Sequence, residues 1–403
     1  MGQTQGKMIG YWVGNGSGGE WKILLLRHGN DATRATFCYT ISSLYKTFYT
    51  MKNTLIIFLL FLTYTTSFAL STTVRNDKPR GDTTAQDSIN ILYKELFKAF
   101  KIGYLYRKTV DWKAVEAETY SKLKPYKNFK ASLNEITNLF DKINATHCLV
   151  YRGDDKYTVT KKVISKDLYS TQWRSKYDSE PPFEAKVLDE KYGYILIPGM
   201  VFFDNSAANM HRVAQPLYDK IVDIKTNHKI EGWIIDLRFN TGGNSTPMLL
   251  ALYDFLGDHD IWGELNLNKR LVSKSKLKQG SYTQKSETIA SINPRGVLLD
   301  QVKVALITGI FTGSSGEITA LAFKGRPNTI FVGENTAGFT TGNVSWPLPY
   351  GTIMALTTGY DSDRNGNYYP FITPDVEISK QDNFDDLMAD ANIQEAIKFI
   401  RQE

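Results

Sequence analysis

The chain has 403 residues, of which 42% are hydrophobic and 22% charged, a composition ordinary for a soluble globular protein. Its length predicts about two to three structural units. The formal net charge is +6, but the residues after position 69 hold 42 basic against 40 acidic side chains. That near balance gives no basic patch for nucleic acid, so we expect no nucleic-acid partner.

Residues 51–69 have the order of a secretory signal peptide. A basic start at Met51-Lys52-Asn53 precedes the apolar run 55–62, and small residues end at Ala69. The apolar run is too short to span a bilayer comfortably. We therefore expect cleavage after Ala69 and a mature protein that is not integral to a membrane. Residues 1–50 show no helical or strand periodicity and are interpreted as an upstream segment from a start assigned too early.

The mature chain is expected to be exported to the periplasm, the cell envelope or the extracellular space. It keeps one cysteine, Cys148, so no internal disulfide can form. Leu70 rather than a cysteine comes directly after Ala69, which argues against a lipid anchor there. Residues 70–84 are polar and are predicted to be a disordered leader.

Helical periodicity begins near Asp87, and residues 85–147 are predicted to form an N-terminal helical region. Apolar side chains recur there at three- and four-residue spacings, as at Leu92, Leu96 and Phe100. Residues 148–190 mix charged and β-branched stretches and are predicted to form a small β-rich cap or linker.

From residue 191 to 380, predicted strands alternate with predicted helices. This order favours right-handed βαβ crossovers and a largely parallel sheet, hence an α/β core. A hairpin is expected at 344–360, and an amphipathic helix at 392–401 within a C-terminal segment 381–403. The expected core strands are 193–197, 232–237, 302–307 and 329–332, and the expected core helices are 205–227, 247–255 and 314–323.

Two glycine-containing junctions between a strand and a helix could carry chemistry. In the first, Thr312-Gly-Ser-Ser-Gly-Glu317, the hydroxyl of Ser314 lies at a helix N-terminus, where free N–H groups favour a nearby oxyanion. A plain helix cap explains the same serine. Glu317 stands where G-x-S-x-G would require glycine, which disfavours an α/β-hydrolase.

The second junction is Asp236-Leu-Arg-Phe-Asn-Thr-Gly-Gly-Asn244. Its paired glycines can leave backbone N–H groups exposed, as half of an oxyanion hole requires, although they also suit a simple tight turn. Neither G-x-G-x-x-G nor a P-loop lysine is present, which disfavours phosphate binding.

Together with Gly333-Glu-Asn-Thr-x-Gly338 and Pro374-Asp375-Val, these junctions resemble the tail-specific, or C-terminal processing, peptidases. This family is also called S41 or tricorn-core-like. The similarity covers about residues 190–380 and keeps the family's motif order; the Thr-x-Ser-Ser-Gly-Glu form is most similar to the nisin-resistance-protein type.

The resemblance implies a mixed-sheet, ClpP/crotonase-like core and a serine-type endopeptidase that needs no metal or organic cofactor. It implies Ser314 as the nucleophile, since aligning Ser-x-x-Glu selects it over Ser315. The N–H groups of Gly242 and Ser315 would form the oxyanion hole, and the partner would be a peptide or protein substrate. The oligomeric state is left open.

Two features depart from the family pattern. Phe339 stands where the Ser/Lys branch carries its lysine, and Phe cannot accept a proton. The chain also has no room for the PDZ module inserted in many relatives. His147 is then the candidate base, because it lies where the Ser/His branch carries its histidine; the competing interpretation is a histidine at a helix C-terminus.

No third catalytic residue stands out. Asp361 and Asp363 lie where the family can place an acid that orients the histidine, but both also suit a turn before Asn365-Gly366. A Ser/His pair without a clear acid leaves a second hypothesis open, namely a catalytically silent peptide-binding or envelope-scaffold protein on the same fold.

Overall fold

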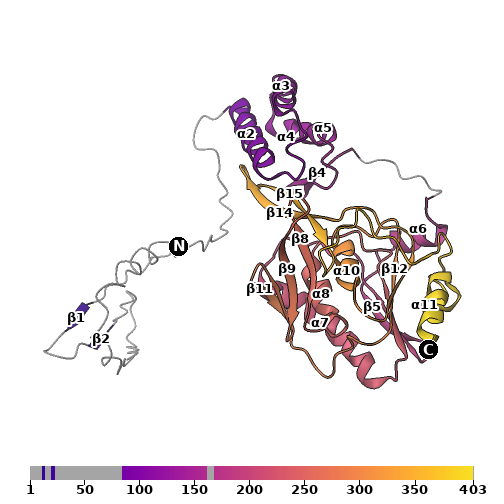
Figure 1. Ribbon diagram of the computed structural model, residues 1–403. Helices are drawn as coiled ribbons and strands as arrows, with labels where there is room; N and C mark the ends of the chain where they lie inside the picture. The colour runs from indigo at the N-terminus through magenta and orange to yellow at the C-terminus, as the bar shows by residue number, and fades with distance from the viewer. Residues whose placement is uncertain (1–10, 14–19, 23–83, 161–167, 403) are drawn as a thin grey trace, which may run out of the picture. The chain divides into compact units, whose positions relative to one another are not determined.

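The computed structural model describes residues 11–13, 20–22, 84–160 and 168–402 (Figure 1). The predicted signal peptide at 51–69 and nearly all of the expected leader lie outside these residues. Two three-residue strands, β1 (Tyr11–Val13) and β2 (Glu20–Lys22), pair antiparallel. They were not predicted, because three residues are too few for an alternating pattern to be recognised.

The predicted N-terminal helical region is confirmed. Its first helix begins with a capping box in which Thr84 and Asp87 exchange hydrogen bonds. The apolar stripe of that helix is buried, with Leu92, Leu96 and Phe100 fully enclosed. The helices are α2 (Ala85–Gly103), α3 (Trp112–Leu123), α4 (Phe129–Ser132) and α5 (Glu135–Lys142).

The predicted α/β core is also confirmed. Among the described residues its sheet has the strand order β16-β13-β12-β7-β6-β5, with β5 antiparallel to β6 and the other pairings parallel. The strands β6, β7 and β12 are buried at every position, as expected for parallel strands covered on both faces. The strands are β5 (Glu184–Leu188), β6 (Tyr192–Leu196), β7 (Gly232–Asp236), β12 (Val304–Thr308), β13 (Thr329–Gly333) and β16 (Val376–Glu377).

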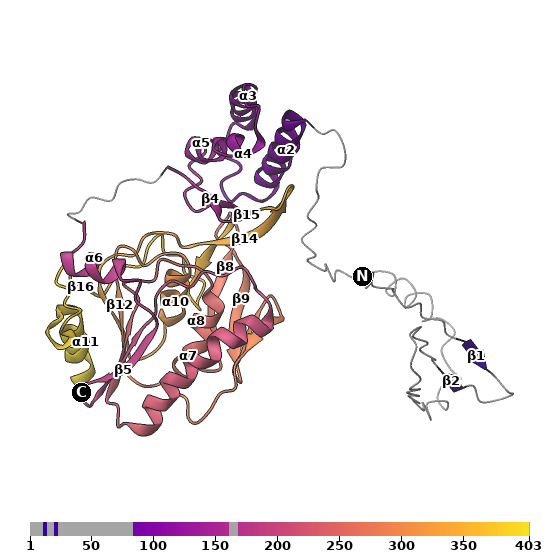
Figure 2. The ribbon, with the colours of Figure 1, turned by 180° about the vertical axis from the view of Figure 1, so that it is seen from behind.

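Helices cover both faces of this sheet (Figures 1 and 2). Alternate side chains of β7 divide between two hydrophobic clusters, with Trp233 and Ile235 in one and Ile234 in the other. The first cluster includes side chains of α7 (Ala207–Asn227), α8 (Ser245–Ala251), α9 (Tyr253–Leu256) and α10 (Ser315–Phe323). The second includes side chains of α6 (Thr171–Asp178) and α11 (Ala391–Arg401). The 3₁₀ turn η2 (Leu387–Ala389) lies beside α11.

A second, antiparallel sheet joins the helical region to the core. Its order among the described residues is β11-β10-β9-β8-β15-β3-β4, with β14 paired to β15. Side chains of β3, β14 and β15 pack with α2 and α5 in one hydrophobic cluster. The strands are β3 (Leu149–Arg152), β4 (Asp155–Tyr157), β8 (Asp260–Leu265), β9 (Leu271–Lys278), β10 (Ser281–Gln284), β11 (Glu287–Ser291), β14 (Thr341–Leu348) and β15 (Thr352–Ser362).

The expected hairpin at 344–360 is therefore β14–β15, and the expected C-terminal helix is α11. The meander β8–β11 was not predicted. Within the part of the chain that the structure describes, none of the helices has the length and apolar character needed to cross a membrane.

Candidate active site

Both glycine-containing junctions lie at one edge of the central sheet. Strands β7 and β12 are parallel neighbours, so the segments that follow their carboxyl ends emerge side by side. The Gly313 N–H donates a 3.0 Å hydrogen bond to the Asn240 carbonyl, which ties one segment to the other. This edge is where open α/β sheets usually bind ligands.

Ser314 has a backbone conformation that is rare for a residue with a side chain. Its φ is 53° and its ψ is −116°, directly before α10. Such non-glycine residues cost roughly 1–3 kcal/mol and tend to occur at functional sites. The turn places Ser314 at the positive N-terminal end of α10.

The structure brings His147 to Ser314 across 167 positions of the chain. The imidazole Nε2 lies 3.0 Å from Ser314 Oγ, and Nδ1 lies 2.7 Å from Thr341 Oγ1. If Thr341 accepts a proton from Nδ1, Nε2 carries the lone pair and can accept the Ser314 hydroxyl proton. This tautomer is the one that a general base requires.

Strand β14 and Phe339, two residues before it, contact His147. Asn343 Nδ2 donates to the His147 carbonyl at 2.8 Å, next to the bulge in β14. The Phe339 ring lies 5.1 Å from the imidazole, centroid to centroid, at the place of the family's lysine. Burial lowers the pKa of His147 to about 4, although its contact with Thr341 opposes the shift. The imidazole is therefore neutral at physiological pH.

The carboxylate of Glu317 organises the turn at Ser314. It accepts hydrogen bonds from the N–H groups of Ser314, Gly338 and Phe339 at 3.0, 2.9 and 2.7 Å. The Thr336 hydroxyl donates a fourth at 2.5 Å. Burial raises the pKa of Glu317, and these donors counteract the shift. One side chain thus fixes both the strained serine and the ring that covers His147.

The Gly242-Gly243 turn lies against Ser314. A Cβ at Gly242 would lie 2.9 Å from Ser314 Cβ, so this approach requires glycine. The Gly242 N–H donates to Asn240 Oδ1 at 3.2 Å, and is therefore already paired in this structure. The Ser315 hydroxyl donates to the Gly243 carbonyl at 2.6 Å, which ties the turn to α10. Ser315 is the first residue of that helix, where N–H groups lack an intrahelical partner.

Neither candidate acid contacts His147. Asp363 accepts hydrogen bonds from the Asn365 and Asn367 N–H groups at 2.8 and 2.9 Å, as expected for a turn-forming aspartate. Asp361 is fully buried, and within the described residues neither of its carboxyl oxygens has a hydrogen-bond partner. Burial raises the pKa of Asp361 well above its usual range. The Thr341 hydroxyl, rather than a carboxylate, contacts Nδ1 of His147.

Thr341 was not predicted from the sequence, because an acid was expected to orient His147. A threonine that begins a strand carries no distinguishing sequence signal, since threonine is common in strands for reasons of packing. Its partnership with His147 depends on the β14–β15 hairpin reaching residue 147, which the local sequence does not reveal.

The other histidines of the described residues lie outside the site. His211 Nδ1 contacts the Ser291 carbonyl, and His259 Nε2 lies 3.6 Å from an Asp300 carboxyl oxygen. His228 ends α7. Within the described residues no group of three or more His, Cys, Asp or Glu side chains could hold a metal ion.

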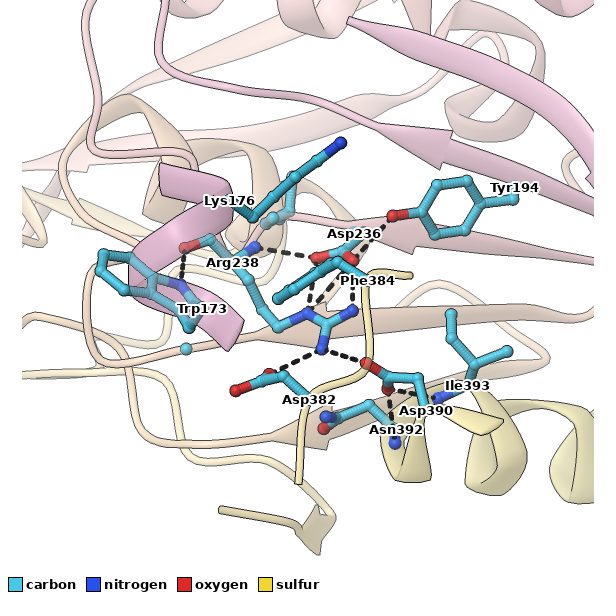
Figure 3. A network of polar contacts seen from close by, with 12 residues as sticks. Trp173, Lys176, Tyr194, Asp236, Arg238, Asp382, Phe384, Asp390, Asn392 and Ile393 are labelled. Atoms are coloured by element: carbon cyan, nitrogen blue, oxygen red, sulfur yellow. Dashed lines mark hydrogen bonds and ion pairs between the residues drawn. The ribbon is translucent and has the colours of Figure 1, made fainter. Parts of the chain in front are cut away.

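Asp236 and Arg238, from the second motif, form a network of polar contacts at the end of β7 (Figure 3). The buried Arg238 guanidinium pairs with Asp236, Asp382 and Asp390 at 2.6, 2.8 and 2.8 Å. The network joins the end of β7 to the segment leading into α11. These residues therefore fix loops rather than face Ser314.

Comparison with known proteins shows which family the α/β core resembles. The sequence model of peptidase family S41 matches residues 191–378. This stretch is therefore similar to peptidase family S41. A nisin-resistance protein of Lactococcus lactis subsp. lactis is 35% identical to this chain over 152 residues, which cover 37% of this chain and 46% of that protein. The matched part thus spans less than half of that relative.

Solved structures share the fold of this chain. A lipoprotein from Streptococcus agalactiae is similar with a TM-score of 0.55 and 23% identity, over 79% of this chain and 97% of that one. A protein from Parabacteroides merdae gives a TM-score of 0.50 and 16% identity, over 80% of this chain and 98% of that one. The resemblance inferred from the four motifs is confirmed, with the helical N-terminal region included in the shared fold.

Proposed function

We propose that this chain is an exported serine endopeptidase that cleaves peptide or protein substrates through an acyl-enzyme on Ser314. The observation that carries the proposal is the 3.0 Å contact between His147 Nε2 and Ser314 Oγ, made by a serine in a strained turn before α10. The match of residues 191–378 to the sequence model of family S41 supports the peptidase activity.

The acylation step follows from this geometry. Ser314 Oγ attacks the scissile carbonyl carbon while His147 Nε2 takes the hydroxyl proton. The imidazolium then gives that proton to the leaving amine as the C–N bond breaks. Water attacks the resulting ester, again with His147 as the base, and Ser314 regains its proton. Thr341 accepts the Nδ1–H throughout and keeps the ring oriented.

The oxyanion of each tetrahedral intermediate would be held by backbone N–H groups of Ser315 and of the Gly242-Gly243 turn. Because the Gly242 carbonyl accepts from the Met200 N–H, the trans peptide directs the Gly243 N–H to the opposite side. A role for the Gly242 N–H itself would require its bond to Asn240 to open. Such donors are typically worth ~10²–10³ in turnover each.

Export is supported by the signal-peptide pattern at residues 51–69 and by the lipoprotein of similar fold. Amino-terminal sequencing of protein from its native host should begin near Leu70. Recovery of a mature protein that begins at Met1 would contradict export.

The first prediction concerns the nucleophile and base. A serine-directed phosphonate should label Ser314, and Ser314→Ala should abolish both labelling and peptide cleavage with little change in thermal stability. His147→Ala should lose about as much turnover, and the double variant little more, because the two residues act as one unit. His211→Ala is the matched control and should stay active. A folded wild-type protein that neither reacts nor cleaves would instead be the silent peptide-binding protein.

A further inference from the structure

Three partly exposed tyrosines form an aromatic cluster near the candidate active site. Tyr106 comes from the segment after α2, Tyr360 from β15, and Tyr368 from the loop after β15. The ring centroids of Tyr360 and Tyr368 are 4.8 Å apart, and those of Tyr106 and Tyr360 are 6.2 Å apart, both with edge-on geometry. Burial raises the pKa values of Tyr106 and Tyr368, so these phenols remain neutral. We call these three residues the tyrosine cluster.

A lysine of the same chain already occupies the tyrosine cluster. Lys269 Nζ lies 4.4 Å from the centroid of Tyr368 and 5.5 Å from that of Tyr360. None of the ion pairs found among the described residues involves Lys269, so aromatic faces rather than a carboxylate receive its charge. Lys269 lies in the exposed turn between β8 and β9 with a φ of 55°, a strained value for a residue with a side chain.

The tyrosine cluster lies beside the Ser314–His147 pair. In the register of the β14–β15 hairpin, Tyr360 is directly opposite Thr341, whose hydroxyl contacts His147. Directly paired residues on one face of a sheet have Cβ atoms about 4.5–5.5 Å apart. The cluster is thus two contacts away from Ser314, through Thr341 and His147, and a peptide that extends from Ser314 along β15 would reach these rings. The carboxylate of Glu317 adds negative potential near Tyr368.

We propose that the tyrosine cluster is a subsite for a cationic side chain, lysine or arginine, of the peptide substrate, and that Lys269 fills it until the substrate displaces it. This inference rests on the proposed function, whose substrate class it narrows. A cation over exposed rings gains about 0.5–1 kcal/mol, and about 2 when water is excluded. The contact of Lys269 with the exposed rings is weak. A substrate cation can therefore displace Lys269, because the bound peptide excludes water from the cluster and the cation then binds more tightly.

Matched peptides test the subsite. Pairs of quenched fluorescent peptides would carry lysine or norleucine at one position at a time around the cleaved bond. Norleucine keeps the four-carbon chain and removes the charge. At one position, kcat/KM should favour lysine about three- to thirtyfold, the rate ratio that corresponds to the cation–π energies above. Glutamate at that position should give the slowest cleavage of the three.

Variants should change that ratio in opposite directions. Tyr368→Leu should reduce the lysine-to-norleucine ratio toward one, while Lys269→Gln should raise it by removing the internal competitor. Tyr177→Leu, at a similarly exposed tyrosine on α6, and Lys278→Gln, at an exposed lysine of β9, should keep the wild-type ratio. A ratio near one at every position in the wild type, or a ratio that survives Tyr368→Leu, would overturn the subsite.

Binding separates this inference from the peptidase proposal. The Ser314→Ala protein should bind the lysine peptide more tightly than the norleucine peptide, and Ser314→Ala with Tyr368→Leu should bind both equally, as measured by fluorescence anisotropy. This result is expected whether or not the wild type cleaves. Equal affinities in Ser314→Ala would refute the subsite even if cleavage occurs, whereas failed cleavage with preserved discrimination would refute only the peptidase.

Discussion

At the residue scale, the site depends on how a few side chains share hydrogen bonds. The Ser314 N–H donates to Glu317, and the Ser314 hydroxyl contacts His147 Nε2. The other ring nitrogen of His147 contacts Thr341. Phe339 fills the position of the family's lysine and covers the imidazole. With phenylalanine in place of that lysine, the group that lies within hydrogen-bond distance of Ser314 Oγ is the desolvated imidazole of His147.

This arrangement predicts an unusually low acid limit for activity. A general base works only when neutral, so kcat/KM should rise with pH through the pKa of His147. Because burial lowers that pKa to about 4, activity should persist well below ~6.5, the ordinary value for histidine. Phe339→Ala admits water and should move the midpoint upward toward the ordinary value. The measurement is the pH profile of kcat/KM, with the exposed-site variant Val297→Ala as control. A wild-type midpoint near ~6.5 would contradict the burial argument.

Thr341 carries a second prediction at this scale. Thr341→Val keeps the shape but removes the acceptor for the Nδ1–H, so the ring loses its preferred orientation. One hydrogen bond is worth about 1 kcal/mol, and we expect kcat to fall about five- to tenfold with KM nearly unchanged. Thr341→Ser keeps the hydroxyl and should restore most of the rate. Equal kcat values for the valine and serine variants would show that the hydroxyl does not position His147.

At the scale of elements, adjacent strand ends assemble the two motifs. Residues after β7 and β12 meet because these strands are parallel neighbours, and this could be predicted from the alternating strand and helix pattern. The strands β6, β7, β12 and β13 and the helices α7, α10 and α11 were predicted because their apolar periodicity is strong. The β14–β15 hairpin was predicted from its turn residues, whereas helix α6 was not predicted, since a β-rich cap or linker was expected there. The meander β8–β11 was missed: in β9 the buried positions Ser275 and Leu277 alternate with lysines, and a buried serine hides the pattern.

The same reasoning explains which parts of the site could be predicted. Ser314, His147 and the glycine turn lie at junctions that sequence motifs mark. The contact of Thr341 with His147 and the tyrosine cluster depend on long-range pairing of β15 with β3 and with β8, for which no local pattern exists. The fully buried Asp361 also remains without a role that the described contacts explain.

Helix α10 is coupled to the oxyanion turn by one side chain, which gives a prediction at the element scale. Ser315→Ala removes the hydrogen bond to the Gly243 carbonyl and frees the turn to reorient its N–H groups. We expect kcat/KM to fall about tenfold, and affinity for a peptide boronate to fall in parallel, while substrate binding to the Ser314→Ala background stays the same. Ser179→Ala removes a similar hydroxyl-to-carbonyl bond on α6 and is the control. Unchanged boronate affinity in Ser315→Ala would exclude this coupling.

At the scale of the whole molecule, the Arg238 network joins segments that are distant in sequence (Figure 3). Strand β7, helix α6 and the segment before α11 meet there: the Trp173 indole donates to the Arg238 carbonyl, and Asp382 and Asp390 bond the guanidinium. Trp173 also stacks on Phe311, which precedes the nucleophile turn, with ring centroids 4.2 Å apart. The network thus ties the C-terminal segment to the segment that leads into the Ser314 turn.

Arg238 therefore gives a prediction about stability rather than catalysis. Arg238→Met keeps much of the apolar stem but leaves Asp236, Asp382 and Asp390 buried without their cation. Removing one partner of a buried ion pair costs about 3–5 kcal/mol, because the remaining charges stay desolvated. We expect a loss of that size in the free energy of unfolding, measured by urea denaturation at neutral pH. Arg174→Met breaks the exposed pair with Asp178 and should cost less than about 1 kcal/mol. If both variants lose equally little, the three carboxylates do not depend on Arg238, and the network does not hold the C-terminal segment to the core.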